Sequence, residues 1–122
     1  MKGKARILVV DDEKLITTML TDVLEAHGYE VLVAFDGQEG LKKARAERPD
    51  LVILDVMMPK LDGFKVARLL KFDRNFQHIP IIMLTAKAGE QDLHTSKLSG
   101  ADVYLVKPVE PKLLLERVRS LL

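Results

Sequence analysis

The sequence of 122 residues predicts an α/β fold in which a parallel sheet lies between helices on both of its faces. Two observations support this prediction. Short apolar runs alternate strictly with amphipathic stretches of helical periodicity, and the runs are mostly continuous, without an apolar–polar alternation of their own. Continuous runs rich in Val, Ile and Leu are typical of strands that are buried on both faces of a parallel sheet. Strand–helix–strand units of this length favour right-handed crossovers, which place helices on either side of the sheet.

The apolar runs define five expected strands, which are Ile7–Val10, Val31–Ala34, Leu51–Leu54, Ile79–Leu84 and Val103–Val106. Pro80 has no N–H to donate, so it must lie at the beginning of its strand or at an edge of the sheet. For five strands in this alternation the expected doubly wound order is 2-1-3-4-5, the flavodoxin-like arrangement.

Five helices are expected between and after the strands, at about residues 15–27, 36–48, 62–72, 89–99 and from 110 onward. Gly28 follows the first helix as a left-handed stop. Asp36 and Glu39 have the spacing of a capping box at the start of the second helix. Glu110 and Pro111 have the pattern of an N-cap followed by a first-turn proline.

Length and composition indicate one domain over residues 1–122 and exclude several classes of protein. The formal net charge of +1 gives no reason to expect direct binding of nucleic acid or of a membrane surface. The chain contains no cysteine, which excludes disulfides and thiolate metal sites. The apolar stretch near the start is too short for a signal-peptide core or a membrane span, so a cytoplasmic location is expected.

Polar side chains stand at the carboxyl ends of four expected strands. Asp11 and Asp12 follow the first strand, Asp55 follows the third, Thr85 the fourth and Lys107 the fifth. Open α/β sheets bind their ligands at this edge. The first and third strands are neighbours in the expected order, so the three aspartates converge in one crevice, flanked by the threonine and the lysine.

This set of groups indicates a site for phosphoryl transfer. Carboxylates that lie close together repel one another, so a positive charge should compensate them. Hard oxygen ligands in a small open site suit Mg²⁺ or Mn²⁺. Lys107 brings a mobile positive charge to Asp55 or to an anion bound there. A carboxylate nucleophile that attacks phosphorus needs such neutralising charges around it.

Four segments of the sequence together resemble a known family. They are ILVVDDE, LVILDVMMPKLDG, IIMLTA and GADVYLVKP, and they begin at residues 7, 51, 81 and 100. In this order and at this spacing, they resemble the signature segments of the receiver domains of two-component response regulators. The resemblance extends over essentially the whole chain.

The resemblance implies a role for each residue of the site. It implies that Asp55 is the phosphoacceptor, assisted by Lys107 and Thr85. It implies that Mg²⁺ binds to Asp11, Asp12, Asp55 and the backbone carbonyl of Met57. It also implies that Thr85 and Tyr104 form the switch and that the Lys107–Pro108 peptide bond is often cis. Leu15, Met19 and Pro108 are candidate contacts for a kinase, although Leu15 and Met19 have an equally good interpretation as the edge of the core.

For the whole chain, the resemblance implies a signalling switch. The phosphoryl group is expected from a sensor histidine kinase or a histidine phosphotransfer protein. The output is expected at the face formed by the fourth helix, the fifth strand and the fifth helix. The chain is expected to catalyse only its own phosphoryl transfer and a slow autodephosphorylation, and to be a monomer that can dimerise on phosphorylation.

Three alternatives are less well supported by the sequence. A flavodoxin-type cofactor binder needs a loop rich in Ser, Thr and Gly after the first strand, where this chain has DDEK. A phosphohydrolase that uses an aspartyl phosphate needs an acid two residues after the nucleophile, where this chain has Met57. A receiver that cannot be phosphorylated and acts only as a binding module does not need all five pocket residues, and this chain has all five.

Overall fold

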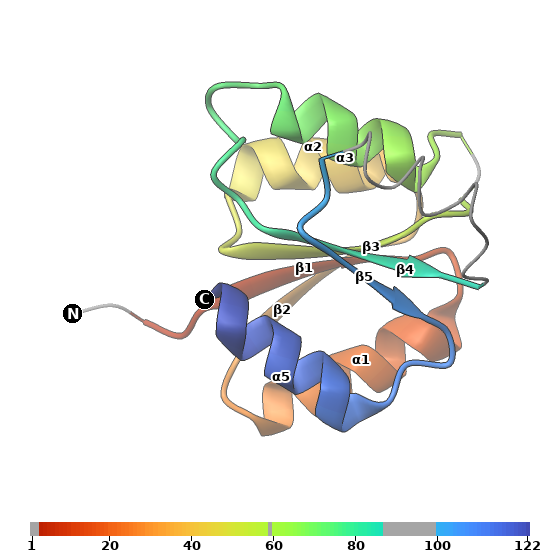
Figure 1. The fold of residues 1–122 in the computed structure, drawn as a ribbon, viewed down its shortest axis with the longest axis vertical. Coiled ribbons are helices and arrows are strands. Elements are labelled where there is room, and N and C mark those ends of the chain that lie inside the picture. The colour runs from red at the N-terminus through yellow and green to blue at the C-terminus, as the bar shows by residue number, and fades with distance from the viewer. Residues whose placement is uncertain (1–2, 59, 87–99) are drawn as a thin grey trace.

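The sheet has the predicted order. The computed structural model of the chain describes residues 3–58, 60–86 and 100–122. Five parallel strands form one sheet in the order β2-β1-β3-β4-β5. The strands are β1 (Arg6–Val10), β2 (Glu30–Ala34), β3 (Leu51–Asp55), β4 (Ile81–Thr85) and β5 (Val103–Val106). Their carboxyl ends meet along one edge of the sheet, to the right in Figure 1.

Helices cover both faces of the sheet, which confirms the doubly wound α/β fold (Figure 1). The described helices are α1 (Lys14–Ala26), α2 (Gly37–Glu47), α3 (Gly63–Lys71) and α5 (Pro111–Leu121). In Figure 1, α2 and α3 lie above the sheet and α1 and α5 below it. The helix predicted at about residues 89–99 lies outside the described residues. None of the helices in the described part of the chain is long and apolar enough to cross a membrane.

The sheet separates two apolar cores, because successive side chains of a strand point to opposite faces. From β3, Val52 and Leu54 join the core under α2 and α3, whereas Leu51 and Ile53 join the core over α1 and α5. All five residues of β3 are buried. A strand with apolar partners on both faces must be apolar along its length, which is why continuous runs predicted this sheet.

The beginning of β4 differs from the prediction. The strand was expected from Ile79, but it begins at Ile81, after the proline. The backbone N–H of Ile79 donates to Phe76 in the preceding turn, 3.0 Å away. Pro80 contributes only its carbonyl, which accepts a hydrogen bond of 3.0 Å from the backbone N–H of Val52. The side chain of Ile79 is apolar and buried, like those of the strand. The prediction therefore included Ile79 in the strand, although its backbone belongs to the preceding turn.

Two of the predicted helix starts behave differently. Asp36 caps α2, because its side chain accepts a hydrogen bond of 2.8 Å from the backbone N–H of Glu39. The Glu39 carboxylate in turn accepts from the backbone N–H of Phe35 at 2.7 Å, which completes a capping-box-like exchange. Glu110 does stand at the N-cap position of α5, but its side chain makes no capping hydrogen bond. The predicted N-cap position of Glu110 and the first-turn position of Pro111 are both confirmed, and the cap is made without a side-chain hydrogen bond.

Candidate functional site

Three aspartates meet at the carboxyl ends of β1 and β3. Asp11 and Asp12 follow β1 directly, and Asp55 is the last residue of β3. Each of the three offers a carboxylate oxygen, and these oxygens lie within 4.8 Å of one another. Asp11 and Asp55 are buried, whereas Asp12 is exposed. The parallel pairing of β1 with β3 brings these strand ends together, as the sequence predicted.

Lys107 bridges the two buried carboxylates. Its Nζ lies 2.9 Å from Oδ2 of Asp11 and 3.1 Å from Oδ1 of Asp55. The second oxygen of Asp11 accepts a hydrogen bond of 2.9 Å from the backbone N–H of Glu13. The backbone N–H of Lys107 donates to the carbonyl of Thr85 at 2.7 Å, which ties the end of β5 to that of β4. The sequence predicted the contact with Asp55 but not the one with Asp11.

Burial and charge shift the pKa values of two groups in this site. Burial raises the pKa of Asp55 to about 6, and the negative charge of Asp11 adds to the rise, while Lys107 opposes it. Burial by itself lowers the pKa of Lys107, but its hydrogen bonds to Asp11 and Asp55 outweigh this, so the pKa lies above its ordinary value. Near neutral pH the ammonium is therefore charged and most of the Asp55 carboxylate is ionised.

The composition of the site fits a hard divalent cation. Three carboxylates and one ammonium carry a formal charge of −2 together (−3 and +1). All the side-chain ligands on offer are oxygens, and Mg²⁺ prefers oxygen ligands and usually keeps several waters. Exposed Asp12 leaves one side of the cluster accessible from solvent. Met57, whose carbonyl is a predicted ligand, follows Asp55 by two residues, and its side chain is exposed.

The two predicted switch residues lie on one face of neighbouring strands. Thr85 is buried at the end of β4, next to the strand that ends in Asp55. Tyr104 on β5 is paired with Met83, two positions before Thr85. The half-buried Tyr104 ring packs against the core that contains Met83. Because side chains alternate along a strand, Thr85 points to the same face as Met83 and Tyr104.

The candidate kinase contacts are all exposed. Leu15, on the first turn of α1, is 84% exposed, and Met19 is 40% exposed one turn later. The interpretation of Leu15 as an edge of the core is therefore wrong. Pro108 is also exposed, and a cis peptide bond joins it to Lys107, as the resemblance implied. These residues stay a predicted docking surface.

Two glycines beside the site were not recognised from the sequence as functional. A Cβ on Gly37 would lie 1.7 Å from the carbonyl oxygen of Leu61, and a Cβ on Gly63 would lie 2.1 Å from that of Asp55. Gly63 therefore allows a close backbone approach to Asp55, and Gly37 allows one to Leu61, in the segment between β3 and α3. Each glycine follows the N-cap aspartate of its helix, in Asp36-Gly37 and in Asp62-Gly63, but this pattern marks only the start of a helix and not a close approach.

Comparison with known proteins agrees with the geometry of the site. The family model described as "Response regulator receiver domain" matches residues 7–119. The chain is 49% identical to the alkaline phosphatase synthesis transcriptional regulatory protein PhoP of Bacillus subtilis (strain 168), over 96% of this chain and 48% of that protein. It is 45% identical to the DNA-binding response regulator MtrA of Mycobacterium tuberculosis (strain ATCC 25618 / H37Rv), over 96% of this chain and 50% of that protein. The chain thus spans about half the length of the curated relatives it matches.

Solved structures of similar sequence share the fold over nearly the whole chain. The chemotaxis protein CheY4 of Vibrio cholerae superimposes with a TM-score of 0.92 at 37% identity, over 98% of this chain and 100% of that chain. A CheY-like receiver domain protein of Methanospirillum hungatei JF-1 superimposes with a TM-score of 0.90 at 33% identity, over 97% and 93% of the two chains. With the acidic pocket in its predicted place, these matches show that the chain belongs to the response regulator receiver domain family of two-component signalling.

Proposed function

We propose that Asp55 accepts a phosphoryl group from a phosphohistidine, in the presence of Mg²⁺, and that the resulting aspartyl phosphate switches the domain. The observation that carries this proposal is the position of Asp55. It is a buried carboxylate at the end of the central strand, with the Lys107 ammonium 3.1 Å away and two further carboxylates beside it. A nucleophile, a cation and a metal-ligand set at one point are the requirements for transfer to a carboxylate.

The proposed transfer is a substitution at phosphorus. A carboxylate oxygen of Asp55 attacks the phosphorus atom, and an O–P bond forms as the P–N bond of the phosphohistidine breaks. The electron pair of that bond stays on the imidazole nitrogen of the donor. Lys107 needs no proton transfer for this step, because its ammonium is charged at neutral pH and can turn toward the phosphoryl oxygens. A bound Mg²⁺ would neutralise charge on the same oxygens.

The other residues of the pocket hold the ion and receive the product. Asp11, Asp12, Asp55 and the carbonyl of Met57 are the proposed Mg²⁺ ligands, and Mn²⁺ is expected to substitute because it accepts the same oxygen ligands. Thr85, at the end of the neighbouring strand, is proposed to donate its hydroxyl proton to the phosphoryl group. Moving that side chain toward Asp55 would free space on the face it shares with Tyr104.

We propose that catalysis is limited to the domain's own phosphoryl transfer and a slow autodephosphorylation. Rapid hydrolysis of an aspartyl phosphate needs an acid or base that activates water near the phosphorus. The position two residues after Asp55 is occupied by Met57, whose side chain has no proton to give or take. The phosphorylated state would then last long enough to act as a signal.

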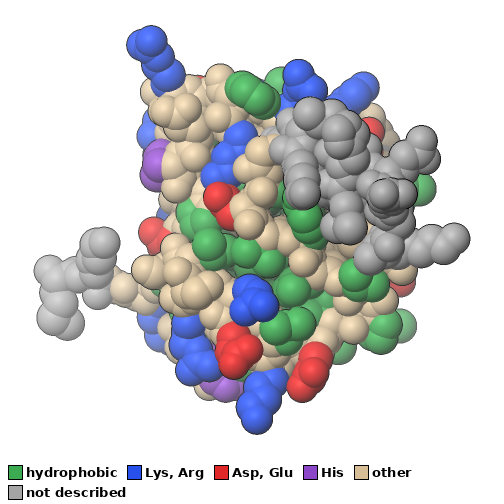
Figure 2. All heavy atoms as spheres, viewed as in Figure 1, with side chains coloured by type: hydrophobic (Ala, Val, Ile, Leu, Met, Phe, Trp, Pro, Cys, Tyr) green, Lys and Arg blue, Asp and Glu red, His purple; other side chains and the backbone are tan. Residues whose placement is uncertain are grey.

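The domain is proposed to regulate a partner or an attached output module. The transcriptional regulatory protein and the DNA-binding response regulator that it matches are about twice its length, which supports a role as the input half of such a protein. Apolar side chains gather around the middle of the face on which β5 lies in Figure 2, and Val106 on β5 is 44% exposed. This supports output, and a phosphorylation-dependent dimer, through the face of β5 and α5.

A small phosphodonor tests the proposed function without the kinase. The purified chain is incubated with acetyl phosphate, with Mg²⁺ in one sample and with an excess of EDTA in the other, and intact masses are recorded. The proposal predicts one added phosphoryl group per chain with Mg²⁺ and none with EDTA. Equal uptake in both samples, or none in either, would contradict it.

A further inference from the structure

The loop between β3 and α3 (residues 56–58 and 60–62) rests on the amino end of α2. An ideal Cβ on buried Gly37, the first residue of α2, would lie 1.7 Å from the carbonyl oxygen and 2.6 Å from the carbonyl carbon of Leu61. Real Cβ atoms essentially never come within 3.0 Å of another heavy atom in this way. The neighbour is backbone, so it cannot turn aside as a flexible side chain does. Only a residue without a Cβ lets the β3–α3 loop lie where it does.

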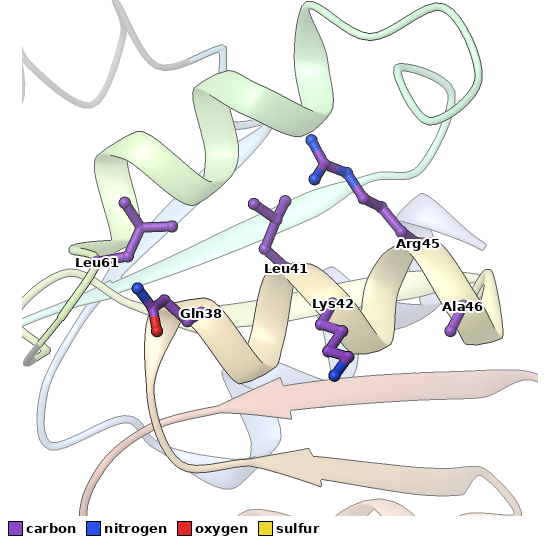
Figure 3. A pocket seen from close by; sticks show the side chains of 6 residues that line it. All are labelled: Gln38, Leu41, Lys42, Arg45, Ala46 and Leu61. Atoms are coloured by element: carbon purple, nitrogen blue, oxygen red, sulfur yellow. The ribbon is translucent and has the colours of Figure 1, made fainter.

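Two side chains attach the same loop to α2. Nζ of Lys60 lies 3.5 Å from Oδ2 of Asp36, whose other oxygen caps the helix. The side chain of Leu61 packs against the core to which Leu41 belongs. Figure 3 shows Leu61 of the loop beside a pocket that Leu41 and Gln38 of α2 also line. The loop is thus held on α2 by a backbone contact, an ion pair and an apolar contact.

The two ends of the β3–α3 loop next to Asp55 are also fixed. The backbone N–H of Val56 donates to the carbonyl of Leu84 at 3.0 Å. The backbone N–H of Gly63 donates to the carbonyl of Val56 at 2.9 Å, and a Cβ on Gly63 would lie 2.1 Å from the carbonyl oxygen of Asp55. Met57 therefore stands between a part of the loop fixed on β4 and a part fixed on α2.

We propose that Gly37 is a positioning residue for the metal and phosphoryl site. It touches none of the reacting groups, and it acts through the carbonyl of Leu61, which sets where the β3–α3 loop lies beside Asp55. This inference rests on the proposed function, because the loop matters for metal binding only if the pocket binds the ion. A methyl group at residue 37 must push the loop, and Met57 with it, away from α2.

The test compares two glycine-to-alanine changes on the same helix. Gly37→Ala disturbs the contact with Leu61. Gly40→Ala is the matched control, because the atoms nearest to its Cβ would be side-chain atoms of Val10, at 2.7 and 2.9 Å. Both changes add a methyl group to a buried glycine of α2 that has no room for it. They differ in whether the β3–α3 loop is pushed.

The primary measurement is the dissociation constant for Mg²⁺, obtained by calorimetric titration of each folded variant. Groups that hold metal ligands in place without binding the metal change affinity by roughly 10–100-fold, so Gly37→Ala is expected to raise the constant at least about tenfold. Gly40→Ala is expected to match the parent. In the metal-free proteins, amide chemical shifts of residues 56–58 and 60–62 are expected to move with Gly37→Ala only.

The possible outcomes separate this inference from the proposed function. If the parent neither binds Mg²⁺ nor takes up phosphoryl groups, the proposed function fails and the inference with it. If the parent does both, and Gly37→Ala binds Mg²⁺ as the parent or as Gly40→Ala does, only the positioning role is overturned. Leu61→Ala decides the question if Gly37→Ala does not fold. It removes the apolar attachment of the same loop and is expected to weaken Mg²⁺ binding, and unchanged affinity would overturn the inference.

Discussion

Lys107 organises the pocket at the scale of single residues. Its ammonium lies within hydrogen-bonding distance of two carboxylates, one of them fully buried. Removing one partner of a buried ion pair typically costs about 3–5 kcal/mol, because the other charge is left without compensation. The lysine therefore keeps Asp11 and Asp55 together when no cation is bound. The carboxylates still outnumber it, which leaves the charge that a metal ion would neutralise.

The raised pKa of Asp55 predicts how stability depends on pH in metal-free buffer. Its pKa rises from 3.8 to about 6 on folding, chiefly through burial and then through Asp11. Between these values the folded state binds more protons at Asp55 than the unfolded state does. The contribution of Asp55 to stability is therefore fully present below about pH 4 and is lost as the pH rises through 6. A shift of this size corresponds to a loss on the order of 2–3 kcal/mol.

Asp55→Asn removes this ionisation and should remove the loss. We expect the variant to be more stable than the parent at pH 7.5 by on the order of 2–3 kcal/mol, and the difference to disappear below about pH 4. Urea unfolding of both proteins at several pH values, in the presence of EDTA, measures this. Equal stability of the two proteins at pH 7.5 would show that burial does not oppose the charge on Asp55.

Asp12 is the residue whose loss should affect metal binding most selectively. Its exposed carboxylate belongs to the acidic cluster, so Asp12→Ala removes a proposed ligand without opening a cavity in the core. We expect the dissociation constant for Mg²⁺ to rise at least about tenfold. Amide chemical shifts followed through a Mg²⁺ titration measure it.

Glu13→Ala is the control for the loss of one negative charge near the pocket. Glu13 is the next residue, it is exposed, and its side chain makes no capping hydrogen bond to α1. A small change in affinity is expected for this variant. If Glu13→Ala and Asp12→Ala weaken Mg²⁺ binding equally, Asp12 acts through its charge alone and is not a ligand.

The convergence of the pocket residues was predictable from the sequence, but their pairing was not. Asp55 and Thr85 are the last residues of their strands, Asp11 and Lys107 directly follow theirs, and the strand order then brings all four together. Whether Lys107 turns to Asp55, to Asp11 or to both depends on side-chain conformations in a packed site. The bond to Asp11 joins residues that are 96 positions apart, and no local pattern encodes it.

At the scale of elements, the ends of β4 and β5 connect the pocket to another surface. Thr85 and Tyr104 share a face of these two strands, and the backbone N–H of Lys107 is bonded to the carbonyl of Thr85. A phosphoryl group on Asp55 is expected to attract the Thr85 hydroxyl. A local charge of this kind typically biases a two-state element by about 1–3 kcal/mol.

Thr85→Ala is expected to separate phosphorylation from this rearrangement. The variant should still take up a phosphoryl group, because Asp55 and Lys107 are intact, but Tyr104 should no longer respond. Amide chemical shifts with and without beryllofluoride, which stands in for the phosphoryl group, measure the response through β5. If parent and variant show the same shifts around Tyr104, the hydroxyl is not the relay.

Helices and strands were predictable where the sequence pattern that indicates an element also stabilises it. Continuous apolar runs predicted the strands because the sheet is covered on both faces, and the Asp36–Glu39 spacing predicted a cap that forms. The sequence also predicted Glu110 as the N-cap of α5, but not whether its side chain would form a hydrogen bond there. A helix that begins with Pro111 already lacks one N–H that needs a partner, so this helix start has less need of a bond from the Glu110 carboxylate.

At the scale of the whole molecule, exposed apolar residues near the pocket predict a surface for the phosphodonor protein. Leu15 and Met19 lie on the first turns of α1, directly after the acidic residues, and Leu15 is 84% exposed. Leu15→Ser should slow phosphoryl transfer from a histidine kinase that phosphorylates the parent, by roughly tenfold if about 1.4 kcal/mol of apolar contact is lost. Transfer from acetyl phosphate should not change.

An exposed leucine in the opposite helical layer provides the control for this prediction. Leu69 on α3 is 44% exposed and lies on the other side of the sheet from α1. Leu69→Ser is expected to leave both rates unchanged. If the two variants slow transfer from the kinase equally, or if neither does, the surface of Leu15 and Met19 is not the docking site.

The overall topology followed from the sequence because few arrangements satisfy the alternation of strands and helices. Right-handed crossovers and two covered faces leave the order 2-1-3-4-5 as the expected solution, and the structure has it. The contact of Gly37 with Leu61 was beyond such reasoning. It depends on how α2 and the β3–α3 loop fit together, and nothing local distinguishes a glycine that allows a close approach from one that only ends a turn.

The most direct test of the central claim is to locate the phosphoryl group. After treatment with acetyl phosphate and Mg²⁺, reduction with borohydride converts an aspartyl phosphate to homoserine, which marks the modified residue permanently. Peptide mass spectrometry then identifies that residue, with a sample without phosphodonor as the control. We predict homoserine at position 55 alone. Homoserine at position 11 or 12 instead, or a phosphoryl group that resists reduction and maps to another side chain, would contradict the assignment of Asp55 as the acceptor.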